Sequence, residues 1–269
     1  MPTELPTPVR ISSVAFFNAT PLTFGLDVDP DVRLRHAVPS ALLTHLQDDA
    51  ADVALLPVID YQRLPDAQII AAGAIGCDGP TLTVRLFAGQ PIGQTSVLAA
   101  DGDSHTSVVL AQIVLRYRYN VRPRLVPLTG APDNATRLLI GDKVITDAPN
   151  LSCQLDLGQA WKDLTGLPFV FAIWTTRHAE RMDTIAEKLT VARERGIEQI
   201  EALVEHQAVP RGWPADVARK YLTQYLKFDV GPRQIEAIGT FHAMAAELGL
   251  VPSPPQPLRF ASGKRRRST

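Results

Sequence analysis

The order of the secondary-structure signals constrains the fold of this chain more than any other feature. Through the first two thirds, short apolar runs that favour strands alternate with segments that favour helices, whereas the last third is helical. Strands are expected over residues 9–17, 32–38, 53–56, 69–75, 82–87, 97–100, 124–128, 137–140 and 169–174. This alternation predicts an α/β fold with parallel sheet and right-handed crossovers.

Helices are expected between and after these strands. They cover residues 39–46, 108–117, a stretch around Trp161 that ends near Gly166, 178–206 with Gly196 as a candidate interruption, 215–228 and 232–248. Two strand–helix units are followed by a helical part in which the chain returns to the first unit. This order predicts two lobes, joined by crossing segments near residues 87–88 and 174–175. The first lobe then combines residues 1–87 with 175–260, and the second comprises 88–174. A cleft between two such lobes is the default place for a ligand.

Charge and cysteine content exclude several classes of partner. The formal net charge of −1 gives no strong attraction to nucleic acid or to an anionic membrane. Cys77 and Cys153 form neither a disulfide framework nor a zinc pattern. The N-terminus lacks the basic and apolar regions of a secretory signal, and no run reaches about 18 apolar residues, so we expect a cytoplasmic protein. The sequence leaves the oligomeric state open.

The C-terminal residues 261–269 contain a basic run from Lys264 to Arg267. We expect a solvated, flexible tail there, with a weak electrostatic contact to an acidic partner as the alternative.

The motifs of several enzyme classes are missing from the chain. It has no Gly-x-Gly-x-x-Gly after the first strand, no phosphate-binding loop of the Walker type, no His-Glu-x-x-His and no Gly-x-Ser-x-Gly. Its six histidines never fall into a metal-ligand cluster. These absences favour a site without metal or cofactor, which works through hydrogen bonds and positioning.

Five segments stand out along the chain. They are residues 18–22 (Asn-Ala-Thr-Pro-Leu), 52–57 with Asp60-Tyr61 beyond, 76–87, 101–108, and the pair 139–142 and 156–171, which ends in Thr-Gly-Leu-Pro-Phe-Val-Phe. In this order they resemble the chorismate dehydratases of the futalosine route to menaquinone. The resemblance extends from about Arg10 to Trp174 and returns from Tyr225 to Gly249.

That resemblance implies a type II periplasmic-binding-protein fold with a ligand cleft between two lobes. It also implies a cytosolic enzyme that converts chorismate into 3-[(1-carboxyvinyl)oxy]benzoate and water without a cofactor. The chain departs from the family at two positions, because Cys77 and Thr83 stand where the family usually has serine. Thr83 keeps the hydroxyl.

Asn18 and Thr83 are the catalytic candidates. The amide of Asn18 follows the first strand and can both donate and accept hydrogen bonds, which suits a hydroxyl or a carboxylate. A turn residue that bonds its own backbone is the alternative, and the family resemblance favours the functional role. Thr83 can donate to a substrate oxygen, with an ordinary β-branched strand residue as the alternative.

Substrate-binding candidates gather at turns and at helix starts. Free N–H groups and the helix dipole at the start of the helix with Ser104, Thr106 and Ser107 favour an anion, with ordinary capping as the alternative. The remaining candidates are Asp78 and Gly79 in the Asp-Gly-Pro turn, Gly141, which allows close approach to the backbone, and Asp142, which alternatively caps a helix.

The proton acceptor is the least defined part of the site. Asp60 and Asp78 are candidate bases, with a surface and a turn aspartate as the alternatives, and His105 and Lys143 are not obvious bases. We therefore hypothesise that a carboxylate of the substrate itself removes the proton. The competing interpretations are a non-catalytic small-anion solute-binding protein of the same fold, the two-lobed enzyme that acts on a later naphthoate precursor, and the sensing domain of a regulator.

Overall fold

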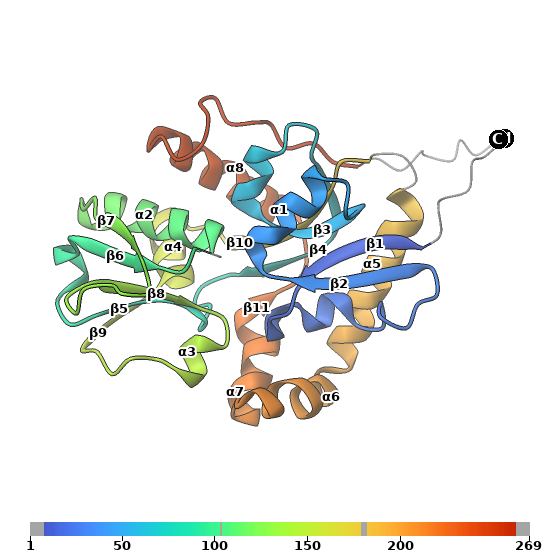
Figure 1. Cartoon of the computed structure of the whole chain (residues 1–269), viewed down its shortest axis with the longest axis horizontal. Coiled ribbons are helices and arrows are strands. Elements are labelled where there is room, and N and C mark those ends of the chain that lie inside the picture. The colour runs from blue at the N-terminus through green and yellow to red at the C-terminus, as the bar shows by residue number, and fades with distance from the viewer. Residues whose placement is uncertain (1–7, 103, 179–181, 262–269) are drawn as a thin grey trace.

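The computed structural model describes residues 8–102, 104–178 and 182–261, which form two β-sheets with helices packed around them (Figure 1). The first sheet has the order β11-β4-β10-β3-β1-β2. Its strands are β1 (Val9–Val14), β2 (Val32–Ala37), β3 (Val53–Pro57), β4 (Gln68–Cys77), β10 (Phe169–Thr176) and β11 (Leu226–Lys227). The two sheets form the cores of two lobes, so the expected two-lobed α/β architecture is confirmed.

The second sheet has the order β7-β6-β8-β5-β9. Its strands are β5 (Val84–Ala88), β6 (Val97–Ala100), β7 (Arg124–Pro127), β8 (Thr136–Ile140) and β9 (Cys153–Asp156). No separate strand is predicted for β9, whose four residues are only partly buried or exposed. Short strands with little buried apolar surface lack the pattern by which strands are recognised.

Both sheets are mixed, because they contain the parallel pairs that the sequence predicts and also antiparallel pairs that it does not. In the first sheet β1 runs parallel to β2 and β3, whereas β10 runs antiparallel to both β3 and β4. The reason is the path of the chain. The strand β4 leads out to the second sheet and β10 brings the chain back, so the returning strand runs in the opposite direction.

The crossings between the lobes come earlier than we expected. Strand β5 belongs to the second sheet, so the first crossing lies within 78–83 rather than near 87–88. Strand β10 belongs to the first sheet, so the second crossing lies within 157–168 rather than near 174–175. An apolar run predicts a buried strand but carries no information on which sheet it joins.

The helices cover the sheets and fill the space beside them. They are α1 (Pro39–Gln47), α2 (His105–Tyr119), α3 (Lys143–Thr146), α4 (Leu157–Thr165), α5 (Met182–Glu198), α6 (Ile200–Leu203), α7 (Ala215–Lys220) and α8 (Pro232–Glu247). Short 3-10 segments are η1 (Phe17–Thr23), η2 (Val58–Arg63), η3 (Ile92–Gln94) and η5 (Val209–Arg211), and two π-helical segments are η4 (Val204–Ala208) and η6 (Tyr221–Tyr225).

Two of the expected helices differ in the structure. Helix α5 continues through Gly196 and stops before Gln199, so Gly196 does not interrupt it. A Cβ atom at Gly196 would lie 2.1 Å from the Pro21 carbonyl oxygen, so the glycine allows α5 to pack closely against η1. The expected helix 215–228 ends instead in η6 and then in β11, which pairs with the edge of β4.

Among the described residues no helix is long and apolar enough to cross a membrane. The basic tail expected over residues 261–269 lies, apart from Ala261, outside the described residues.

Candidate active site

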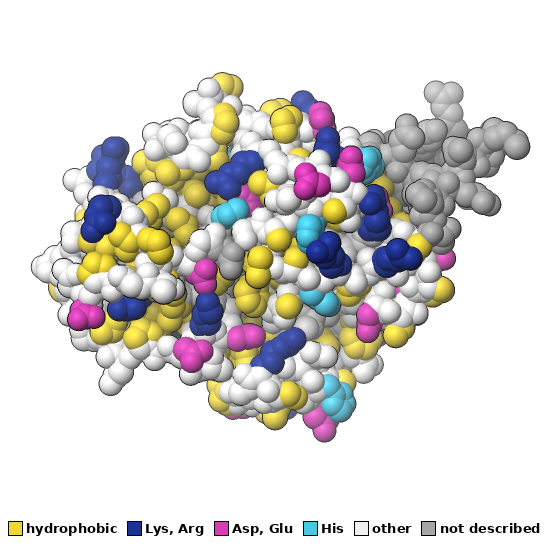
Figure 2. Space-filling view, viewed as in Figure 1, with side chains coloured by type: hydrophobic (Ala, Val, Ile, Leu, Met, Phe, Trp, Pro, Cys, Tyr) yellow, Lys and Arg dark blue, Asp and Glu magenta, His cyan; other side chains and the backbone are white. Residues whose placement is uncertain are grey.

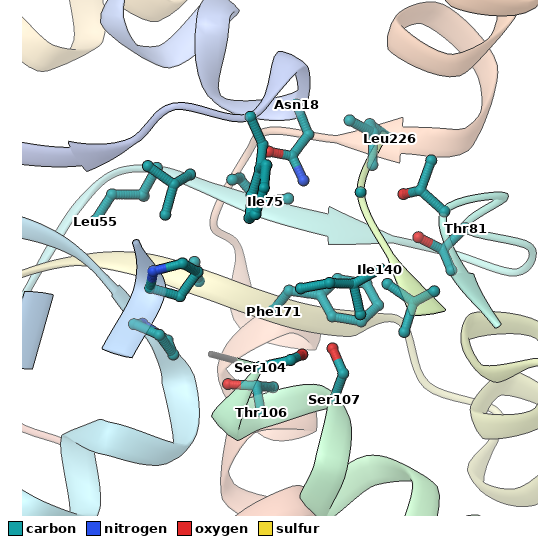
Figure 3. A pocket seen from close by; sticks show the side chains of 18 of the residues that line it. Asn18, Leu55, Ile75, Thr81, Ser104, Thr106, Ser107, Ile140, Phe171 and Leu226 are labelled. Carbon is teal, nitrogen blue, oxygen red and sulfur yellow. The ribbon is translucent and has the colours of Figure 1, made fainter. Parts of the chain in front are cut away.

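A pocket lies where the two lobes meet (Figure 3). Its volume is about 610 Å³, including the part that is open to solvent. The first lobe supplies the ends of β1, β3 and β4, the segment η1, part of β10 and η6, and the second supplies the start of β5, the start of α2 and the end of β8. Strands and helix starts from both lobes therefore converge on one cavity.

The lining is mostly apolar and neutral. Among the described residues that line it, the only ionisable side chains are His105 and Tyr221. Apolar walls come from Val14, Phe16, Pro39, Leu55, Pro57, Ile75, Val84, Ile140, Phe171, Ala172 and Leu226. Such a cavity can hold an apolar ring and orient it through a few hydroxyl and amide groups.

Asn18 and Thr83 reach the pocket and share a third residue. The hydroxyl oxygens of Thr83 and Tyr221 lie 2.6 Å apart, and the side chain of Asn18 lies near the same Tyr221 hydroxyl. Tyr221 is fully buried, and this burial raises the pKa of its phenol. The phenol therefore stays protonated and joins the two catalytic candidates.

Asn18 also brings an unused acceptor to the site. Its Oδ1 atom is buried and has no hydrogen-bond partner among the described residues. A buried polar atom without a partner costs free energy, which a ligand hydroxyl or another donor can recover. The alternative interpretation, a turn residue bonded to its own backbone, is therefore not what the side chain does.

The turn before Thr83 fixes the direction of its side chain. Leu82 has a φ angle of 66°, which is rare for a residue other than glycine, and the Thr83 N–H donates to the Thr81 carbonyl at 2.8 Å. The carboxylate of Asp156 accepts hydrogen bonds from the N–H groups of Thr81 and Leu82 at 3.0 and 2.8 Å. Asp156 thereby stabilises a strained turn whose following residue is Thr83.

The start of helix α2 forms the opposite side of the pocket, where Figure 3 shows the side chains of Ser104, Thr106 and Ser107. Ser104 stands at the N-cap, yet its side chain makes no capping hydrogen bond. The Thr106 hydroxyl accepts a hydrogen bond from the Ile59 N–H at 3.4 Å, which links α2 to the first lobe. The amide groups of the first turn and the helix dipole make this end favourable for an anion.

Three predicted binding residues do not line the pocket. Asp78 forms ion pairs with Lys162 and Arg233, and Gly79 lies in the same turn with a φ angle of 127°. The Asp142 carboxylate accepts a hydrogen bond from the Trp213 indole at 3.1 Å, and burial raises its pKa. Gly141, with a φ angle of 63°, does line the pocket, as do Ser104, Thr106 and Ser107.

Asp60 is not the surface aspartate that we gave as its alternative. Its side chain has no solvent exposure, and its two oxygens lie 2.9 and 2.7 Å from Nδ1 of His105. Its Oδ1 atom also accepts a hydrogen bond from the Arg63 guanidinium at 2.9 Å. Among the described residues, no group of three or more His, Cys, Asp or Glu is arranged to hold a metal ion.

Sequence reasoning missed Tyr221, the residue that joins Asn18 and Thr83. The sequence predicts a helix over 215–228 around it, and an aromatic residue in such a helix is normally part of the core. Its partner Thr83 is 138 residues away in the chain, so no local spacing could indicate the contact. The only indication in the sequence is the residue type, because the hydroxyl of a buried tyrosine usually has a hydrogen-bond partner.

The two-lobed α/β arrangement, with a pocket between the lobes, is the fold of the periplasmic-binding-protein type. A solved protein from Archaeoglobus fulgidus matches with a TM-score of 0.75 and 18% identity, covering 92% of this chain and 100% of that one. The alkanesulfonate-binding protein of Xanthomonas axonopodis pv. citri matches with a TM-score of 0.64 and 11% identity, covering 94% and 97% of the two chains.

The sequence then identifies the family within this class. The profile of a menaquinone biosynthesis family matches residues 9–247, so the chain belongs to that family. A curated relative, the chorismate dehydratase of Thermus thermophilus, is 26% identical over 234 residues, which are 78% of this chain and 85% of the relative.

Proposed function

We propose that this protein is a chorismate dehydratase, a lyase that converts chorismate into 3-[(1-carboxyvinyl)oxy]benzoate and water. Membership of the menaquinone biosynthesis family and the similarity to the Thermus thermophilus enzyme support the assignment. The structural observation that carries it is the contact of Asn18 and Thr83 with one buried phenol inside the pocket between the lobes.

The chemistry of the reaction suits such a lining. Chorismate carries a ring hydroxyl next to a ring C–H, and the loss of both as water makes the ring aromatic. The reaction is downhill, so the enzyme mainly has to hold the ring, let one proton leave and assist the departing hydroxide. Positioning of this kind can lower a barrier by roughly 7–11 kcal/mol in favourable cases.

We assign the roles as follows. Apolar residues such as Phe171 and Ile140 hold the ring, and Asn18 and Thr83 orient the leaving hydroxyl and a substrate carboxylate. That carboxylate takes the ring proton, because no aspartate or glutamate is among the described residues that line the pocket. Tyr221 positions the two catalytic side chains through its hydroxyl.

The direct test is to incubate the purified protein with chorismate and follow the product by chromatography. A product that elutes with 3-[(1-carboxyvinyl)oxy]benzoate, formed by the wild type and not by an Asn18→Ala variant, is the expected result. Unchanged chorismate after long incubation with folded protein would contradict the proposal.

A non-catalytic anion-binding protein is the second candidate, because the fold is shared with the alkanesulfonate-binding protein. Calorimetry separates the two functions, since a binding protein captures its ligand tightly and releases it unchanged. The proposal keeps the cytoplasmic location expected from the sequence, which fractionation of the producing cells tests.

A further inference from the structure

The proposed substrate carries two carboxylates, and the pocket supplies few groups to balance their charge. The described residues that line it include no lysine and no arginine. His105, the first residue of α2, is the only side chain among them that can become a cation. A site for a dianion therefore depends on this histidine and on the positive end of the helix that it begins.

The structure holds the His105 ring in one orientation. Nδ1 lies 2.7 and 2.9 Å from the two oxygens of Asp60, which is fully buried in η2 of the first lobe. Nε2 has no hydrogen-bond partner among the described residues. Nδ1 also lies 3.3 Å from a guanidinium nitrogen of Arg63, so its contacts on this side are taken up by Asp60 and Arg63. In the form in which Nδ1 donates to Asp60, Nε2 is the nitrogen left for a ligand, and it donates when both ring nitrogens carry a proton.

The charges around the ring favour an incoming anion. Arg63 bonds to the Asp60 carboxylate at 2.9 Å and so balances its charge. Asp60 and Arg63 therefore add no net charge beside the ring, and the first turn of α2 adds the partial positive charge of its N–H groups. A substrate carboxylate beside Nε2 therefore meets no uncompensated negative charge from this cluster.

We infer that His105 binds one carboxylate of the substrate through Nε2 and so makes the pocket specific for a dianion, with Asp60 as its positioning residue. The inference rests on the proposed function. Asp60 and His105 come from different lobes, so the carboxylate subsite is complete only when the lobes are in contact.

A histidine oriented by a buried aspartate is also the arrangement of a general base, and kinetics distinguish the two roles. Loss of a general base lowers kcat by about 10²–10⁴-fold. Loss of a group that binds the substrate and the transition state equally raises KM and leaves kcat nearly unchanged.

The test compares His105→Gln, His105→Arg and Asp60→Asn with the exposed control His206→Gln, after circular dichroism has shown that each variant is folded. We expect His105→Gln to raise KM by about tenfold to a hundredfold with kcat within about threefold, because one charge-assisted hydrogen bond is lost. We expect His105→Arg to restore most of the affinity, Asp60→Asn to raise KM less, and the control to match the wild type. A large loss of kcat at unchanged KM in His105→Gln would make the histidine a base and overturn the inference.

Calorimetry with the proposed product and its two monomethyl esters adds a measurement that a purely structural role would not change. His105→Gln should lower the affinity for the diacid and for the ester that keeps the contacted carboxylate. The affinity for the ester that lacks this carboxylate should not change. An equal loss of affinity for all three ligands, or no loss for any of them, would contradict the inference. A wild type that leaves chorismate unchanged refutes the proposed function instead, which keeps the two failures distinguishable.

Discussion

The hydroxyl of Thr83 lies 2.6 Å from the hydroxyl of Tyr221, and these two residues join the start of the second lobe to the helical C-terminal part of the first. Tyr221 also contacts the side chain of Asn18. The two catalytic candidates therefore both lie beside one buried phenol.

Replacement of Asn18 by alanine should lower kcat by about 10²–10³-fold, the loss that follows removal of one oriented hydrogen-bonding group from a reaction centre. The free energy of unfolding should fall by no more than about 1 kcal/mol, because the Oδ1 atom has no partner among the described residues and only the interaction with the Tyr221 hydroxyl is lost. Steady-state kinetics and urea unfolding measure the two effects. A variant that unfolds readily but retains its kcat would contradict the catalytic role.

Replacement of Tyr221 by phenylalanine should lower kcat by about threefold to tenfold, the kinetic equivalent of one neutral hydrogen bond. The ring itself stays packed against Phe17 and Trp213, so the variant should fold. Tyr225→Phe in the same π-helical segment is the matched control, because Tyr225 does not line the pocket. Equal effects of the two substitutions would show that the Tyr221 hydroxyl has no special role.

Thr83 should tolerate serine but not valine. Serine keeps the hydroxyl that contacts Tyr221, so kcat should stay within about threefold, whereas valine removes it and leaves the buried phenol without this partner. In a double-mutant cycle, the effects of Thr83→Val and Tyr221→Phe on kcat should be less than additive because the two residues act as one unit. Strict additivity would mean that the two hydroxyls act independently.

These residues show which features can be predicted from the sequence and which depend on tertiary packing. Local patterns predicted β6 over residues 97–100 and the start of α2, because apolar periodicity and a polar helix start are properties of neighbouring residues. The family resemblance led to Asn18 and Thr83. Their contact with Tyr221 depends on how η6 packs against the first lobe, which no local pattern encodes, and the sheet that β10 joins depends equally on the whole chain.

Asp78 and Asp60 show that the sequence does not predict whether a carboxylate is exposed or buried. Both are aspartates near apolar runs, yet one forms ion pairs at the surface and the other is fully buried beside His105. The burial of a carboxylate is set by the elements that cover it, here η2 and the start of α2, and these are 42 to 45 residues apart in the chain.

Replacement of Gly196 by alanine tests the packing that positions Asn18. The new Cβ atom would lie 2.1 Å from the Pro21 carbonyl oxygen and 2.6 Å from its Cα atom, and such backbone atoms cannot simply rotate away. We expect the free energy of unfolding to fall by about 1–3 kcal/mol and kcat to fall as well, because η1 carries Asn18. Gly239→Ala is the control, since a Cβ atom there meets nothing within 4 Å. Denaturant unfolding of both variants measures the difference.

His242 predicts how stability depends on pH. The residue is 1% exposed. Its Nε2 donates to the Val58 carbonyl at 2.9 Å and its Nδ1 accepts from the Gln62 amide at 2.9 Å, so the ring is held in the neutral form. Burial lowers the pKa of His242 from 6.5 to about 4. Between these values the unfolded chain binds more protons than the folded one, so stability is fully present above about pH 6.5 and falls as the pH drops towards 4.

The difference between pH 7 and pH 5 should be about 2 kcal/mol from this residue, since one pKa unit corresponds to about 1.4 kcal/mol. The control is His242→Gln, whose side chain can form hydrogen bonds but does not titrate. Because other groups titrate in the same range, we compare how steeply the free energy of unfolding changes with pH in the wild type and in this variant. Urea unfolding at several pH values measures both slopes. In the wild type, His242 binds a proton only when the chain unfolds. The variant lacks this proton uptake, so its free energy of unfolding should depend less on pH. Identical slopes would mean that His242 is already protonated in the folded protein at pH 5 and that its ring is not held as the contacts with Val58 and Gln62 require.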